Sequence, residues 1–132
     1  GSTVATYVSG IVARYLPNAH IDETHHINKV DAPSGTSVRT AEVIAAERCC
    51  APTNAPAAEG DAVVADVPIT SHRLPDVIAE QVVTFTGNGE TITVGHKTTS
   101  RDSYDEGIRA AVAYAATHTG LTVGLDQVLG IR

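Results

Sequence analysis

The segment from Glu23 to Thr36, E-T-H-H-I-N-K-V-D-A-P-S-G-T, holds the residues whose types and spacing favour chemistry. His25 and His26 can exchange protons near neutral pH, because imidazole titrates in that range. Lys29 follows three residues after His26 and supplies a positive charge. Together these side chains predict a site for proton transfer on a small acidic molecule.

A turn rich in Pro, Ser and Gly connects these residues to a predicted helix. It runs from Asp31 to Thr36, and either Ser34 or Thr36 is available as the N-cap. The first amide groups of a helix lack partners within the helix, and the helix dipole makes that end positive. Gly35 lets a ligand approach the backbone closely. With Lys29, the helix start predicts a binding site for a carboxylate.

Each of these features also has a purely structural interpretation. A histidine pair beside a lysine is commonly a solvated strand end, and Pro-Ser-Gly-Thr before a helix is commonly a capped turn. Adjacent residues of a strand point to opposite sides, so His25 and His26 should differ in role unless the chain turns there. Neighbouring residues seldom ligate one zinc ion, so we predict no metal site. The contiguity of histidines, lysine and turn favours the functional interpretation.

The elements that must position these residues follow from the spacing of apolar side chains. Apolar residues three and four apart predict helices over 3–16, 36–48 and 103–118. Alternating or β-branched residues predict strands over 19–25, 63–70, 77–85 and 90–97. A hairpin turn is expected at 87–89 and a surface loop at 51–60. The order predicts an α+β domain with a mainly antiparallel or mixed four-stranded sheet and helices on one face.

The composition restricts the class of protein. The chain has 132 residues and a formal net charge of -6, and 42% of its residues are hydrophobic, so one domain with its own core is expected. No basic run suggests nucleic-acid binding, and no apolar stretch reaches the roughly 20 residues of a membrane span. There is no signal-peptide pattern, and Cys49 and Cys50 are expected to be reduced thiols, so we expect a cytoplasmic protein.

The 23–36 segment resembles the substrate-site signature of the 4-hydroxy-tetrahydrodipicolinate reductase (dihydrodipicolinate reductase) family of the lysine and diaminopimelate pathway. The family pattern E-x-H-H-x-x-K-x-D-A-P-S-G-T matches throughout. The resemblance continues through G-E-T-I-T-V-G-H, which ends at His96, to G-L-T-V-G-L-D-Q-V-L near the C-terminus. This sequence departs from the family at Pro75 and Ala79, where glycines are common, and at Tyr104, where phenylalanine is usual. We expect these departures to alter the shape of the pocket.

The resemblance implies hydride transfer from NADH or NADPH to a cyclic, unsaturated dicarboxylate, coupled to proton delivery. It implies that His25 is the general acid/base and Lys29 a proton donor. It further implies that His26 binds substrate and that Gly35 with Thr36 binds a carboxylate through the backbone. Additional candidate site residues are Ser34, Arg73, His96 and Arg101.

The family is tetrameric through the sheet of this domain and carries a nucleotide-binding domain ahead of it. The sequence contains no GxGxxG motif and no P-loop, so a Rossmann domain is not expected within this chain. We therefore expect residues 1–132 to form a single substrate-binding and oligomerisation domain. Its closing helix and tail, about 103–132, would pack on the nucleotide-binding domain, and NADH or NADPH would bind only in the complete enzyme.

Three functions fit these residues. The chain is expected to be the substrate-binding and proton-transfer half of an NAD(P)H-dependent reductase. A stand-alone relative with nucleotide-independent chemistry, such as a cyclase, isomerase or dehydratase, would use the same histidines on a related imine or dicarboxylate. A non-catalytic ligand-binding module would need only the carboxylate site.

Overall fold

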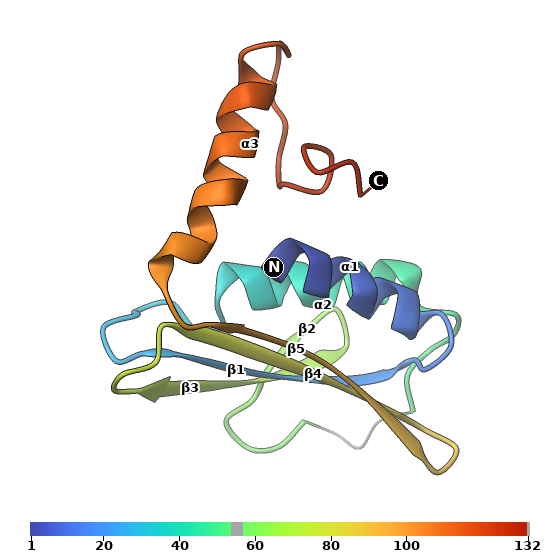
Figure 1. Cartoon of the computed structure of the whole chain (residues 1–132). Coiled ribbons are helices and arrows are strands. Elements are labelled where there is room, and N and C mark those ends of the chain that lie inside the picture. The colour runs from blue at the N-terminus through green and yellow to red at the C-terminus, as the bar shows by residue number, and fades with distance from the viewer. Residues whose placement is uncertain (54–56, 132) are drawn as a thin grey trace.

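The computed structural model describes residues 1–53 and 57–131 and contains a five-stranded mixed sheet with two helices against one face (Figure 1). Residues 54–56, within the predicted loop over 51–60, lie outside the described residues. The elements in chain order are α1 Ser2–Ala13, β1 Asn18–His26, α2 Gly35–Glu47, β2 Ala62–Val64, β3 Val67–Leu74, β4 Ala79–Gly87, β5 Glu90–Thr98, the 3-10 helix η1 Arg101–Tyr104 and α3 Asp105–Ala115. The predicted α+β class is confirmed.

The strand order β2-β3-β1-β4-β5 places β1 at the centre of the sheet. β1 pairs in parallel with β3 and antiparallel with β4. In this register His25 lies opposite Arg73 on β3 and opposite Ala79 on β4. The end of β1, with its two histidines, is therefore flanked by strands on both sides.

The core lies between the sheet and helices α1 and α2. Its largest fully buried apolar side chains are Phe85, Ile21, Ile44 and Ile69. Alternate residues of β1 face this core, and the buried series along the strand is Ala19, Ile21 and Glu23. Glu23 therefore occupies a position that apolar residues hold elsewhere on the same strand face.

The sequence predicts four strands, and the structure has five because the predicted strand over 63–70 contains a tight turn. Ala65 and Asp66 adopt positive φ values of 49° and 60°, and Val64 pairs directly with Val67. The chain reverses over these two residues, as in a two-residue hairpin. Ala is not typical of such a position, so the turn carries no sequence signal. At 87–89 the predicted turn does form, with positive φ at Asn88 and Gly89.

The predicted first helix forms, but most of its apolar residues do not face the core, although Val12 packs against it. The buried residues of α1 are Ser9, Gly10 and Ala13. A Cβ at Gly10 would lie 2.9 Å from Cγ1 of Val43 on α2, so the small residue permits close packing of the two helices. The apolar Val4, Val8 and Ile11 are exposed.

Helix α3 extends away from the sheet (Figure 1) and has no buried residue. The chain after α3 turns back toward the helix. Cδ1 of Leu125 lies 3.2 Å from the position that a Cβ atom at Gly107 would occupy. Part of the apolar tail therefore packs on α3, whereas Leu121 and Val123 are exposed. Over the described ranges, none of the helices is long and apolar enough to cross a membrane.

Candidate active site

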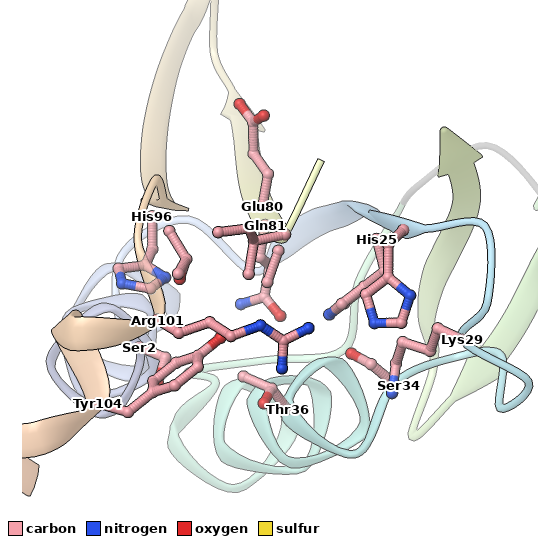
Figure 2. A pocket seen from close by; sticks show the side chains of 14 residues that line it. Ser2, His25, Lys29, Ser34, Thr36, Glu80, Gln81, His96, Arg101 and Tyr104 are labelled. Atoms are coloured by element: carbon pink, nitrogen blue, oxygen red, sulfur yellow. The ribbon is translucent and has the colours of Figure 1, made fainter. Parts of the chain in front are cut away.

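A cavity of about 270 Å³ lies where the end of β1 meets the start of α2 (Figure 2). Its lining comes from β1, the following loop, α2, β4, β5, η1 and Ser2 at the start of α1. The structure brings together most of the residues that the sequence singled out, namely His25, His26, Lys29, Ser34, Thr36, His96 and Arg101. Gly35 and Arg73 lie outside this lining. Gly35 borders a neighbouring cavity that shares Thr36 with the first.

Basic side chains from separate elements face the cavity. Figure 2 shows the guanidinium group of Arg101 pointing between Thr36 and Gln81. Lys29 approaches from the loop after β1. The lining also contains Glu80, whose carboxylate lies 3.3 Å from Nζ of Lys97. Because the Glu80 side chain points away from the cavity (Figure 2) while Lys29 and Arg101 line it, the cavity is suited to an anion.

The start of α2 supplies backbone donors beside the cavity. Ser34 is the N-cap, and its buried side chain accepts a hydrogen bond from the backbone N–H of Ser37 at 3.2 Å. At Gly35 an added Cβ would have no heavy atom within 4 Å, so the space beside the backbone is open. The predicted turn and helix start therefore form as expected, with Ser34 rather than Thr36 as the cap.

His25 is paired with a buried carboxylate. Its Nδ1 lies 2.6 Å from Oε2 of Glu23, and the Glu23 side chain has no exposed surface. Both atoms are buried, and neither makes a hydrogen bond of regular geometry among residues 1–53 and 57–131, so the close N···O contact is their main polar interaction. Since Nδ1 faces Glu23, Nε2 is the nitrogen left for the cavity.

The Glu23 carboxylate is held on its other oxygen as well. Nη2 of Arg73 lies 3.0 Å from Oε1. Burial alone would raise the pKa of Glu23, but hydrogen bonds from Ser71, Arg73 and Ser34 outweigh that effect and hold the pKa below its ordinary value. Glu23 is therefore an ionised carboxylate at neutral pH.

Burial is also the largest influence on the pKa of His25. It lowers the pKa of the imidazole, and although the Glu23 charge opposes this, the charges of Lys29 and Arg73 lower the pKa further. The imidazole is therefore neutral at pH 7 in the unliganded protein. A neutral ring with its Nδ1 at a carboxylate presents a lone pair at Nε2.

Lys29 and Arg73 are connected through the loop after β1. Nζ of Lys29 lies 2.7 and 2.8 Å from the two carboxylate oxygens of Asp31, and this contact lowers the pKa of Asp31. Nε of Arg73 donates to the carbonyl of Lys29 at 3.2 Å, and Nη2 donates to the carbonyl of Asp31 at 2.6 Å. Arg73 therefore holds the loop that carries Lys29.

Sequence reasoning missed Glu23, Glu80 and Gln81 as residues of the site. For Glu23 a signal was present, because residues two apart on a strand share a face and Glu23 precedes His25 by two. Glu80 and Gln81 are brought to the site by register, opposite Thr24 and Glu23 on β1. Nothing in their local sequence indicates that pairing.

Comparisons with known proteins agree with this geometry. The family described as "Dihydrodipicolinate reductase, C-terminus" matches residues 1–129. The 4-hydroxy-tetrahydrodipicolinate reductase of Clavibacter michiganensis subsp. michiganensis (strain NCPPB 382) is 38% identical over 135 residues, which is 99% of this chain and 49% of that protein. The enzyme of that name from Mycobacterium sp. (strain KMS) is 37% identical over 137 residues, covering 99% and 56%. The chain spans about half the length of the curated relatives it matches.

A solved structure has the same fold. It is the dipicolinate-bound dihydrodipicolinate reductase from Paenisporosarcina sp. TG-14, which superimposes with a TM-score of 0.78 at 32% sequence identity. The match covers 96% of this chain and 50% of that one. Family, relatives and fold agree over nearly the whole sequence, and the chain belongs to the dihydrodipicolinate reductase family, as a C-terminal domain of that family.

Proposed function

We propose that this chain is the substrate-binding and proton-transfer part of an NAD(P)H-dependent reductase that acts on a cyclic, unsaturated dicarboxylate. The observation that carries the proposal is one cavity that is lined by Lys29, Arg101 and His25. In it, Nδ1 of His25 contacts the carboxylate of Glu23. The related Paenisporosarcina reductase is described with bound dipicolinate, a planar ring with two carboxylates. A ligand of that class matches the charge of this lining.

In this proposal the two ends of the ligand meet different donors. Lys29 and the backbone at Gly35 and Thr36 bind one carboxylate, which replaces Asp31 as the partner of the Lys29 ammonium. Arg101 lies across the cavity and binds the second carboxylate. His26 contributes a further contact to the substrate. The ring would then lie beside Nε2 of His25.

His25 supplies the proton in this mechanism. A bound dianion raises the pKa of a nearby imidazole and opposes the lowering caused by burial, so the ring takes up a proton at Nε2 when substrate binds. Reduction of an unsaturated ring adds a hydride to one atom and a proton to another. NADH or NADPH supplies the hydride when bound to the complete enzyme. The imidazolium gives its proton to the reduced substrate, with Lys29 as a second donor.

The exposed apolar faces of α1 and α3 are proposed to pack on a nucleotide-binding domain. Val8 and Ile11 on α1 and Ile108 and Val112 on α3 are exposed. Apolar groups gathered on the surface of a soluble domain commonly mark an interface. The relatives are about twice as long as this chain, which leaves room for such a domain.

The open face of the sheet is proposed as the surface of a homo-oligomer, in keeping with the tetramer that the family resemblance implies. On β1 this face carries His20 and Asp22, which alternate with buried residues. Sedimentation or light scattering of the purified chain gives its mass in solution. A monomer at micromolar concentration would contradict this part of the proposal.

Binding of dipicolinate tests the proposed function. We expect titration calorimetry to detect binding to the 132-residue chain, and Lys29→Ala to weaken it by about tenfold or more, the usual effect of losing a charged hydrogen bond. Arg14→Ala is the matched control, because it removes one positive charge from an exposed pair with Glu47. Failure to bind at millimolar dipicolinate would contradict the proposal.

Turnover separates the proposed function from the two alternatives. We expect no oxidation of NADH or NADPH by the 132-residue chain with the pathway substrate, and oxidation when the chain is joined to a nucleotide-binding domain of a relative. Turnover of a related imine without any nucleotide, abolished by His25→Ala, would instead support a cyclase, isomerase or dehydratase. Binding with no turnover in either form would support a binding module.

A further inference from the structure

We propose that Glu23 and Arg73 are positioning residues, which fix the tautomer of His25 and hold Lys29 beside it. The inference deepens the proposed function and rests on the role given there to His25 as proton donor. Neither residue lines the cavity, so neither is expected to touch substrate. Their effect would pass through the two side chains that do line it.

The position of Glu23 needs an explanation beyond folding. Its side chain is fully buried on the core-facing side of the central strand, in series with Ala19 and Ile21. An ionised carboxylate in such a place is costly unless it is paired and hydrogen-bonded. An apolar residue there would continue the core, whereas Glu23 directs one oxygen to Arg73 and the other to His25.

The contact with His25 determines which nitrogen carries the proton. An ionised carboxylate can only accept hydrogen bonds, so Nδ1 of His25, 2.6 Å from Oε2 of Glu23, must be the protonated nitrogen of the neutral ring. Nε2 is then the atom that gains and loses a proton on the cavity side. Without the carboxylate, the ring could carry its proton on either nitrogen.

Arg73 connects this pair to the second proton-bearing group. Its Nη2 lies 3.0 Å from Oε1 of Glu23 and 2.6 Å from the carbonyl oxygen of Asp31. Its Nε donates to the carbonyl oxygen of Lys29. One guanidinium group therefore fastens the loop that carries Lys29 to the carboxylate that orients His25. A planar fork of donors is required for this arrangement, and lysine could not reproduce it.

Nitrogen-detected NMR of the His25 ring in the 132-residue chain tests the inference directly. We expect the neutral ring to carry its proton on Nδ1. We expect Glu23→Gln to reduce the population of that tautomer and to make His25 titrate at lower pH, because the negative charge that favours the imidazolium is lost. Glu47→Gln is the matched control, because it removes a half-buried carboxylate that is paired with Arg14 outside the site, and it should change neither property.

Two further variants keep the test decisive. Glu23→Asp retains the charge but shortens the side chain, so we expect the His25 titration to return toward that of the wild type while the ring is held less firmly. Arg73→Lys retains the charge but loses the fork. We expect it to leave the His25 tautomer largely intact and to weaken dipicolinate binding several-fold through Lys29.

The outcomes distinguish this inference from the proposed function. A wild-type His25 protonated on Nε2 would overturn the inference without any variant, as would a folded Glu23→Gln chain whose His25 tautomer and titration are unchanged. Dipicolinate binding by such a chain would still support the proposed function. If His25 shows the expected tautomer but the chain does not bind dipicolinate, the inference about Glu23 and His25 stands and the proposed function is overturned.

Discussion

Glu80 carries a negative charge near a cavity that Lys29 and Arg101 make favourable for anions, although its side chain points away from that cavity (Figure 2). Its carboxylate is partly balanced by Lys97, 3.3 Å away, but the pair is exposed enough for water to screen it. In a site for a dicarboxylate, Glu80 therefore opposes binding only weakly, through the long-range effect of its charge. A negative charge near the ligand reduces affinity for every anion and discriminates most strongly against those with the highest charge.

We therefore expect Glu80→Gln to increase the affinity for dipicolinate by at most about threefold, since even paired exposed charges contribute only roughly 0.2–1 kcal/mol. Titration calorimetry at low ionic strength measures the change, and added salt should reduce it. Glu90→Gln is the matched control, because Glu90 is exposed at the other end of the same hairpin. Weaker binding by Glu80→Gln would mean that Glu80 contributes a favourable contact instead.

Most of the site residues that the sequence predicted belong to one continuous segment, and His96 and Arg101, which also line the cavity, were predicted from the family resemblance. His25, Lys29 and Ser34 are near neighbours in the chain, so their spacing carried the signal. Gln81 and Glu80 reach the cavity only because β4 pairs with β1 in a particular register, and register depends on the packing of the whole sheet. Arg73 was a candidate for the site, and the structure places it behind the cavity, against Glu23 and the Lys29 loop.

Among the elements, α1 illustrates how periodicity can predict a helix and yet leave its orientation open. Its apolar residues recur at helical spacing, but the helix buries Ser9, Gly10 and Ala13. Small residues let two helix backbones approach closely, whereas a stripe of larger residues is what a hydrophobicity pattern detects. The large residues of α1 remain available for another surface. The sequence also fails to predict that β2 and β3 are separate strands, because Ala65 in the turn between them is not a typical turn residue.

Two glycines in helices should respond oppositely to alanine. In a helix interior alanine is more favourable than glycine by about 1 kcal/mol. At Gly10 the added methyl group would lie 2.9 Å from Cγ1 of Val43, a buried residue, and overpacking commonly costs about 1–3 kcal/mol. We expect Gly10→Ala to lower the free energy of unfolding by about 1 kcal/mol, measured by urea denaturation.

Gly107→Ala is the matched comparison on α3. There the added methyl group would lie 3.2 Å from Cδ1 of Leu125, the end of a flexible side chain, which can move aside. We expect Gly107→Ala to leave the free energy of unfolding unchanged or to raise it by up to about 1 kcal/mol. Equal destabilisation by both substitutions would contradict the packing of α1 on α2 described above.

Considered as a whole, the molecule has a well-packed half and an unpacked half. The sheet with α1 and α2 contains every buried apolar residue of the described chain except Leu16, which follows α1. Helix α3 and the tail expose Ile108, Val112, Leu121 and Val123. The site lies at the boundary between the halves, because Arg101 and Tyr104 of η1 line it. A domain packed on α3 would therefore meet the same cavity.

The buried histidine and carboxylate of the site should make the chain sensitive to acid. The pKa of His25 in the folded chain lies below its ordinary value of 6.5, so on acidification the unfolded chain binds a proton before the folded chain does, and the free energy of unfolding falls below about pH 6.5. Burial, with the N-terminal charge, lowers the pKa of His96 in the same direction. The pKa of Glu23 lies below 4.5, so its contribution is complete above that pH and is lost as pH falls through the folded value.

We therefore expect urea denaturation between about pH 8 and pH 3 to give a free energy of unfolding that decreases toward acid, in a first step below pH 6.5 and a second below pH 4.5. His25→Gln should reduce the first step, leaving the part due to His96, and should preserve the second. His118→Gln, in the exposed chain after α3, is the control and should change neither step. A free energy of unfolding that stays constant down to pH 5 would contradict the burial of His25 against Glu23, because that burial is what separates the folded pKa from the unfolded one.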